Sequence, residues 1–134
     1  MKIIVIKLDI PNKNNRVYPK TVMEKAIEQY QNQIEKGLAI GVIAEYDIMH
    51  GYCGTDLSKA SHIVEKLKIE NDNLVAEIRI LDTPYGQKLL KMFETKEIVF
   101  RPRGIGQVHT IDGIHTIYDY KLISVDALEA NEAA

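Results

Sequence analysis

Two neighbouring stretches in the middle of the chain alternate apolar and polar residues with a period of two. The first covers Ser61 to Ile69 and the second covers Leu74 to Ile80, with Asn71-Asp72-Asn73 between them. Such alternation is typical of strands with one buried face, and Asn and Asp favour tight turns. The pattern predicts an antiparallel β-hairpin, so the chain must form a sheet that rests on a core.

Two helices are predicted, one on each side of this hairpin. Apolar residues recur at helical spacing from Pro19 to Lys36, and Gly37 stands where helices commonly end. Asp82-Thr83-Pro84 offers a capping side chain and a first-turn proline ahead of the apolar residues Leu89, Leu90 and Phe93. The second helix is expected to be the shorter of the two.

Further strands are expected around these elements, and together they define a fold class. Asp112-Gly113 is a strong hairpin signal between two of them. The strand-like stretches are Ile3 to Leu8, Leu38 to Ala44, Ile98 to Phe100, Ile105 to Ile111 and Ile114 to Val125. The order of these strands and helices along the chain predicts one α+β domain over residues 1–134, with a bent antiparallel β-sheet or barrel and two helices. The tail is expected to fray from about residue 127.

Charge and composition exclude several classes of function. The formal net charge is −2, so no overall positive field draws the chain to extended nucleic acid or to an anionic membrane. No apolar run reaches the roughly 18 to 20 residues of a membrane span. The single Cys53 and four scattered histidines lack zinc-site spacing. We therefore expect no membrane association, no metal and no cofactor.

Four blocks, in order along nearly the whole chain, are informative together. They are Asn12 to Pro19 with the helix after it, Ser61-His62 with its strand, Ile80 to Gly86 with its helix, and Arg103 to Val108 with Tyr118 to Asp126. Together they resemble the prohead core protease family of tailed bacteriophages, whose fold is shared with herpesvirus assemblins. The resemblance implies a prohead-protease-like fold and a phage-encoded protein in the host cytoplasm or at the prohead. Because assemblins dimerise, it also implies a homodimer or a higher homo-oligomer.

The catalytic residues of that family are not retained. Its nucleophile is a serine in a Ser-Ser-Arg-Gly context, where this chain has Arg101-Pro102-Arg103-Gly104. Neither a guanidinium nor a pyrrolidine ring forms an acyl-enzyme. The family's general-base histidine best matches Glu45, or His50 if the loop holds an insertion. Loss of the nucleophile alone costs a serine protease on the order of 10⁶ in rate, so proteolysis by the ancestral mechanism is not expected.

The segment that replaces the nucleophile suggests an anion-binding site. Arginine grips carboxylate or phosphate with two-point geometry, and glycines let backbone N–H groups approach a ligand. We therefore consider Arg101, Arg103, Gly104 and Gly106 as ligand-binding residues, with Glu45 from the neighbouring block. The alternative is a solvated turn in which Arg103 pairs with a nearby carboxylate.

Three further residues have two interpretations each. Arg16 and Tyr18 lie at the N-terminus of the first helix, where free N–H groups favour an anion. Tyr18 packed against the helix is the simpler account. His62 matches a family position and belongs either to the old site or to the packing of its strand.

These observations support two classes of function. The first is a catalytically inactive binding protein, whose partner is a small anionic ligand such as a nucleotide signal of host defence, or a phage capsid-assembly or host protein. The alternative is an active peptidase with a shifted site that uses His50 with Cys53, or His62 with Ser61.

Overall fold

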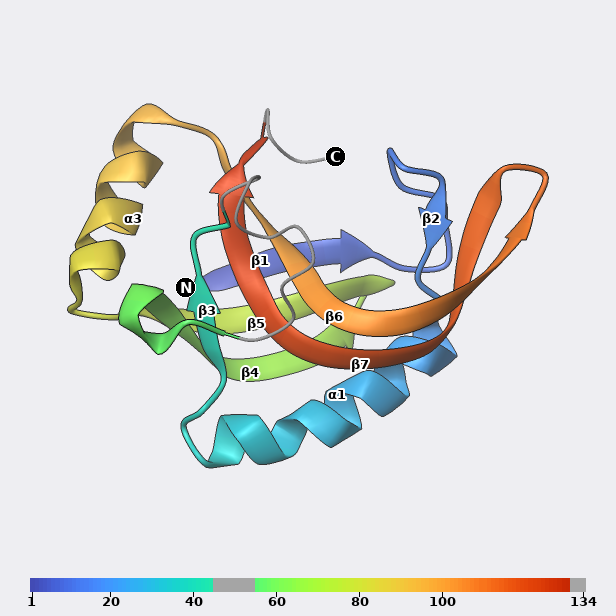
Figure 1. Ribbon diagram of the computed structural model, residues 1–134, viewed down its shortest axis with the longest axis horizontal. Coiled ribbons are helices and arrows are strands. Elements are labelled where there is room, and N and C mark those ends of the chain that lie inside the picture. Colours follow the sequence, from blue (N-terminus) through green and yellow to red (C-terminus); the bar gives the residue numbers. More distant parts are fainter. Residues whose placement is uncertain (45–54, 131–134) are drawn as a thin grey trace.

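The structure is a computed structural model, and it describes residues 1–44 and 55–130. Two sheets curl around a shared interior, with one helix beneath the sheets and the other at one end (Figure 1). Within the described ranges, no helix is long and apolar enough to cross a membrane.

The first sheet contains the central hairpin that the alternation predicts. Its strands follow the order β1-β5-β4-β3, and all neighbours are antiparallel. Asn71 and Asp72 form the turn of the hairpin with φ angles of 51° and 63°, a left-handed conformation that these residue types tolerate. The strands are β1 (Lys2–Lys7), β3 (Ile40–Val42), β4 (Ala60–Glu70) and β5 (Asn73–Ile80).

The second sheet has the order β2-β7-β6, and it differs from the prediction in three respects. β6 (Ile98–Ile111) is one strand that continues through Pro102, which is tolerated because β6 is an edge strand. β7 (Ile114–Glu129) also extends past residue 127, and Ala127 is fully buried, so fraying does not begin there. The two-residue strand β2 (Arg16–Val17) pairs with β7 and has no sequence signal of its own.

The two sheets join along one side and approach each other along the other, which gives a half-barrel. On the joined side, Ile43 bridges Ala127 and the Ala44 N–H donates to the Ala127 carbonyl at 2.7 Å. On the opposite side, Arg101 of β6 donates from Nη1 to the carbonyl of Val5 in β1 at 3.2 Å. We call this second side the β1–β6 seam.

Both predicted helices are present. α1 (Lys20–Glu35) buries Met23, Ala26 and Tyr30 against the sheets, and Gly37 follows with a φ angle of 70°. α3 (Pro84–Thr95) begins at Thr83, whose hydroxyl accepts from the Gly86 N–H at 2.9 Å. A single turn, η1 (Leu57–Lys59), precedes β4. One continuous apolar core lies between the helices and the inner faces of the sheets.

Candidate functional site

The Arg-Gly pair lies in β6, and its arginine is held by a carboxylate on β7. Arg103 donates from Nε to Asp126 Oδ2 at 2.7 Å, and the two side chains are only 10% and 4% exposed. Asp126 Oδ1 accepts from the Val42 N–H at 3.3 Å and from the Ser124 hydroxyl. Arg103 also donates from Nη2 to Thr55 Oγ1 at 3.0 Å. Arg103 is therefore paired with a carboxylate, as the alternative expects, but it lies in a strand and is almost completely buried rather than in a solvated turn.

Arg101, at the place expected for a nucleophile, also binds the protein. Its Nη1 donates to the Val5 carbonyl at 3.2 Å and to the Phe100 carbonyl at 2.8 Å. Unlike Arg103, it meets no carboxylate within the described ranges. Pro102 lies opposite Val125 in the β6–β7 ladder and has no hydroxyl. Arg101 therefore spans the β1–β6 seam and retains a net positive charge.

Ser61 and His62 are fully buried, and His62 connects the two sheets. His62 Nε2 donates to the Val125 carbonyl at 2.7 Å, and its Nδ1 lies 2.8 Å from the Ser61 hydroxyl. Burial lowers the pKa of His62, while the Val125 carbonyl and the Asp126 carboxylate act in the opposite direction. A neutral ring with Nε2 protonated leaves Nδ1 as the acceptor of the Ser61 hydroxyl. This arrangement is that of a packed structural histidine.

A groove opens along the seam beside Arg101. It has a volume of about 560 Å³ and is lined by residues 4–7 and 10–13 together with Tyr18 and Arg101. Lys7, Lys13 and Arg101 are its charged lining residues, and no acidic side chain from the described part of the chain lines it. The groove is thus apolar along β1 and positive in charge.

The two glycines and Arg16 do not contribute to this groove. A Cβ on Gly104 would lie 2.5 Å from Tyr120 Cζ, and one on Gly106 would lie 2.8 Å from Tyr120 Cδ1. Both glycines therefore make room for the Tyr120 ring. Tyr18 packs edge-on against the same ring, with 5.8 Å between ring centroids. Tyr18 therefore packs in the core and also lines the groove. Arg16 lies in β2 and is exposed.

The family can be assigned from a comparison with known sequences. The sequence pattern of the prohead core protein serine protease family matches residues 1–133. The chain belongs to this family. Among solved structures, the capsid assembly protease gp21 of bacteriophage T4 is similar, with a TM-score of 0.86 and 23% identity. The match covers 97% of this chain and 81% of gp21, and it confirms the fold. No curated protein matches the chain.

This member of the prohead protease family has three serines, all within the described residues. Ser61 and Ser124 are fully buried within the sheets. Ser58 is exposed in η1, where its hydroxyl donates to Asp56 Oδ1 at 2.6 Å. An Asp-capped turn of this kind is ordinary local structure. In the described part of the chain, therefore, no serine has both an exposed hydroxyl and a histidine beside it.

Three of the predicted prohead-protease site residues, Glu45, His50 and Cys53, lie outside the described residues. In the rest of the chain, no group of three or more histidine, cysteine or acidic side chains could hold a metal ion.

Sequence reasoning missed the buried polar residues of β7 and the tyrosine beneath them. Ser124 and Asp126 lie two residues apart in a mostly apolar strand, and this spacing places both side chains on one face. Tyr30 of α1 is also buried, and its hydroxyl has no hydrogen-bond partner within the ranges described. Burial, assisted by the Asp126 carboxylate, raises the pKa of Tyr30 to about 12. The sequence did contain a signal for this cluster, because Ser124 and Asp126 are polar residues within an apolar strand.

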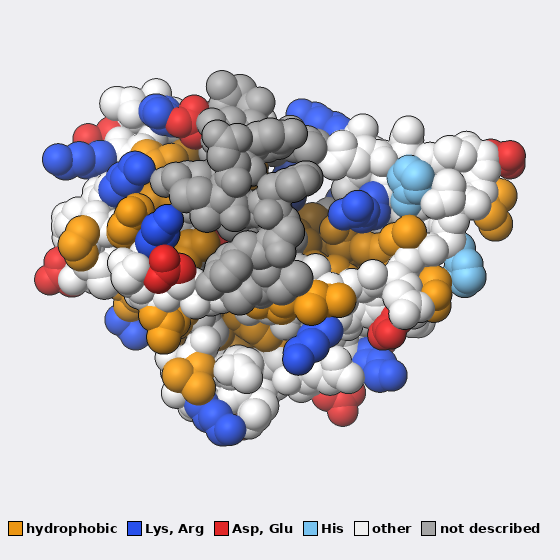
Figure 2. All heavy atoms as spheres, viewed as in Figure 1, with side chains coloured by type: hydrophobic (Ala, Val, Ile, Leu, Met, Phe, Trp, Pro, Cys, Tyr) orange, Lys and Arg blue, Asp and Glu red, His pale blue; other side chains and the backbone are white. Residues whose placement is uncertain are grey.

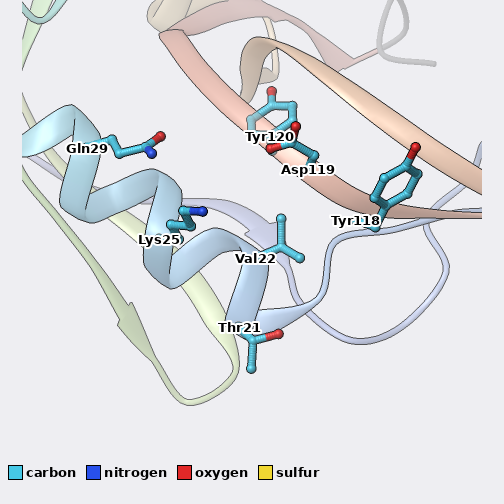
Figure 3. A pocket seen from close by; sticks show the side chains of 7 residues that line it. All are labelled: Thr21, Val22, Lys25, Gln29, Tyr118, Asp119 and Tyr120. Atoms are coloured by element: carbon cyan, nitrogen blue, oxygen red, sulfur yellow. The ribbon is translucent and has the colours of Figure 1, made fainter.

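A second, smaller hollow lies between α1 and β7. Its volume is about 170 Å³, and Figure 3 shows Lys25 and Gln29 of α1 along one wall with Asp119 and Tyr120 of β7 along the other. Positive and negative side chains both line it, so it has no preference for an anion. This hollow is separate from the groove at the seam.

Proposed function

We propose that this chain is a non-cleaving member of the prohead protease family that acts as a binding protein, with the seam groove as its binding site. The observation that carries the proposal is the replacement of the expected nucleophile by Arg101 and Pro102. The positions of the three serines support the proposal, because two are buried and the third binds Asp56, the residue that caps its turn. Without an exposed serine hydroxyl that has a histidine beside it in the described part of the chain, a serine acyl-enzyme has no activated site at which to form.

The chemistry of the groove indicates the class of ligand. Three cationic side chains line it and no acidic side chain of the described residues does, so an anionic group is favoured there. β1 is an edge strand of its sheet and lines the groove, so an extended chain can lie alongside it, next to the Val5 carbonyl that Arg101 binds. We therefore favour an extended acidic segment of a phage or host protein over a small anion.

Two biological roles fit a binding protein of this family. It binds either another component of the prohead during capsid assembly or a host factor, such as a defence protein, that it antagonises. Co-sedimentation with assembling proheads, and its loss in an Arg101→Ala variant, would assign the first role. Binding that persists only with host extract would assign the second.

The binding site is tested with defined probes. We expect extended peptides that carry Glu side chains to bind more tightly than the same peptides with Gln, as measured by fluorescence anisotropy. Arg101→Ala and Lys13→Ala should each weaken binding by about tenfold, the loss of one charged contact. Lys25→Ala, in the second hollow, is the matched control and should bind normally. Equal binding of Glu and Gln peptides would contradict the proposal, and preference for a free nucleotide would assign the small-anion alternative.

The absence of cleavage is tested separately. Long incubation with scaffold or capsid proteins should leave every intact mass unchanged, and a serine-reactive fluorophosphonate probe should leave the chain unlabelled. Cleavage that stops in a Cys53→Ala or His50→Ala variant would replace the proposal with the shifted-site peptidase. Ser61→Ala is the control for the other shifted pair, and it should have no effect because that hydroxyl is buried.

A further inference from the structure

The segment between β1 and α1 forms one wall of the seam groove. Residues 10–13 line the groove, and Tyr18 lines it near the start of α1. Figure 2 shows basic and apolar side chains on the part of the surface where this segment lies in Figure 1. We call residues 9–18, which include β2, the groove loop. Its middle reads Asn12-Lys13-Asn14-Asn15, so asparagines flank the one lysine that the groove loop brings to the groove.

Backbone hydrogen bonds close the groove loop into a hairpin. The Asp9 N–H donates to the Tyr18 carbonyl at 3.0 Å, and the Asn12 N–H donates to the Arg16 carbonyl at 3.0 Å. The returning arm of the hairpin is β2, which pairs with β7 of the second sheet. The groove loop is therefore attached to the body of the protein along its length, and its tip lies between Asn12 and Arg16.

The side chain of Asn12 fixes the turn at this tip. Its Oδ1 accepts from the Asn14 N–H at 2.9 Å and from the Arg16 N–H at 3.0 Å. The first of these contacts is an Asx-turn. The Asn15 N–H donates to the Asn12 carbonyl at 3.0 Å, and Asn15 has a φ angle of 58°. A turn followed by a left-handed residue is a common form of the three-residue hairpin loop.

Lys13 is the residue that the turn presents to the groove. It lies directly after Asn12, it is exposed, and it lines the groove. Within residues 1–44 and 55–130, its ammonium group has no hydrogen bond or ion pair. Its backbone is held while its charge is available to a ligand. A side chain that starts from an ordered backbone loses less freedom on binding than one on a mobile loop.

We propose that Asn12 is a positioning residue of the seam groove, because it holds the turn that presents Lys13 to an acidic side chain of the ligand. This inference rests on the proposed function of the groove. An amide oxygen accepts both N–H groups without adding charge. An aspartate could accept the same two bonds, but it would bring a negative charge to a groove that has no acidic lining residue in the described part of the chain.

Binding of the Glu and Gln peptides, measured by fluorescence anisotropy, tests this role. Asn12→Ala should weaken binding of the Glu peptide by about fivefold, less than Lys13→Ala, because Lys13 must then be ordered on binding. Binding of the Gln peptide should be nearly unchanged. Asn14→Ala keeps its N–H and is the matched control, since its side chain makes no hydrogen bond within the described ranges. This control should bind as the parent does.

Double variants show whether Asn12 acts through Lys13. Adding Asn12→Ala to Lys13→Ala should cause no further loss of affinity, whereas adding it to Arg101→Ala should cause the full loss. A loss that persists without Lys13, or normal binding by Asn12→Ala, would overturn this inference and leave the proposed function intact. A parent protein that binds Glu and Gln peptides equally would refute the proposed function instead.

Hydrogen exchange tests the turn without any ligand. The Arg16 amide should exchange about fivefold faster in Asn12→Ala than in the parent, the effect of one lost hydrogen bond. It should be unchanged in Asn14→Ala. Amides in β5 should exchange equally in all three proteins, which shows that the fold is retained. Equal exchange of the Arg16 amide in the parent and in Asn12→Ala would overturn the inference, whether or not a peptide binds.

Discussion

Arg103 and Asp126 form an ion pair, with 2.7 Å between Nε and Oδ2, in which both side chains are almost completely removed from solvent. Removing one partner of such a pair leaves a buried charge without compensation. We expect Asp126→Ala to lower the free energy of unfolding by about 3 to 5 kcal/mol, measured by urea denaturation.

The control for this prediction is an exposed ion pair on the same molecule. Lys2 and Glu70 also lie 2.7 Å apart, but their side chains are 52% and 37% exposed. Lys2→Ala should therefore lower the free energy of unfolding far less than Asp126→Ala does, because solvent screens an exposed pair. A combined Arg103→Met and Asp126→Leu variant should be more stable than Asp126→Ala, because it removes both charges. Equal losses from the buried and the exposed pair would contradict this account.

Gly41 is required by the close approach of two groups. A Cβ at this position would lie 2.1 Å from His62 Nε2 and 2.5 Å from the Val125 carbonyl oxygen. Gly41→Ala must separate the sheets, so we expect a loss of about 3 kcal/mol or more, the upper end for overpacking. Gly37→Asn is the control, since that site has open space and Asn tolerates its φ of 70°. Similar thermal midpoints for the two variants would refute the prediction.

The buried imidazole of His62 makes stability depend on pH. Burial lowers its pKa in the folded state below the ordinary 6.5, so the unfolded chain binds a proton first as pH falls. The contribution of neutral His62 to the free energy of unfolding is complete above about pH 6.5. It is lost as pH falls toward the lowered pKa of His62 in the folded state. Urea denaturation at about pH 7.5 and at about pH 5 measures this loss in the free energy of unfolding.

A His62→Gln variant isolates this effect, because Gln can still donate to the Val125 carbonyl and the other three histidines are unchanged. The variant should be less stable than the parent at the higher pH, and the difference should shrink at the lower pH. A difference that stays constant with pH would mean that His62 titrates equally in both states.

The elements that sequence predicted well depend on local chemistry. Asn71-Asp72 and Asp112-Gly113 adopt the left-handed turns that their residue types favour, and both hairpins follow from them. Thr83 and Pro84 begin α3 in the same local way. β2 was missed because a strand of two residues is too short to show a period. The prediction divided β6 at Pro102, because proline indicates the end of a strand unless the strand is known to lie at a sheet edge.

The candidate site was predicted less completely, because its contacts join distant parts of the chain. The Val42 N–H and the Asp126 carboxylate are 84 residues apart, and no local pattern connects them. Arg103 could be assigned a carboxylate partner in general terms, but its identity required the β6–β7 register. The role of Gly104 and Gly106 likewise required knowledge that Tyr120 lies against them.

Tyr30 offers a test of the polar cluster from the helix side. Its hydroxyl is buried without a hydrogen-bond partner in the described part of the chain, so the hydroxyl contributes a desolvation cost and no compensating bond. We expect Tyr30→Phe to leave stability unchanged or to raise it by up to about 1 kcal/mol. Because burial raises the pKa of Tyr30 to about 12, the variant should also lack one late step in the ultraviolet titration of the tyrosines. A loss of stability would contradict this prediction and would show that the Tyr30 hydroxyl has a hydrogen-bond partner.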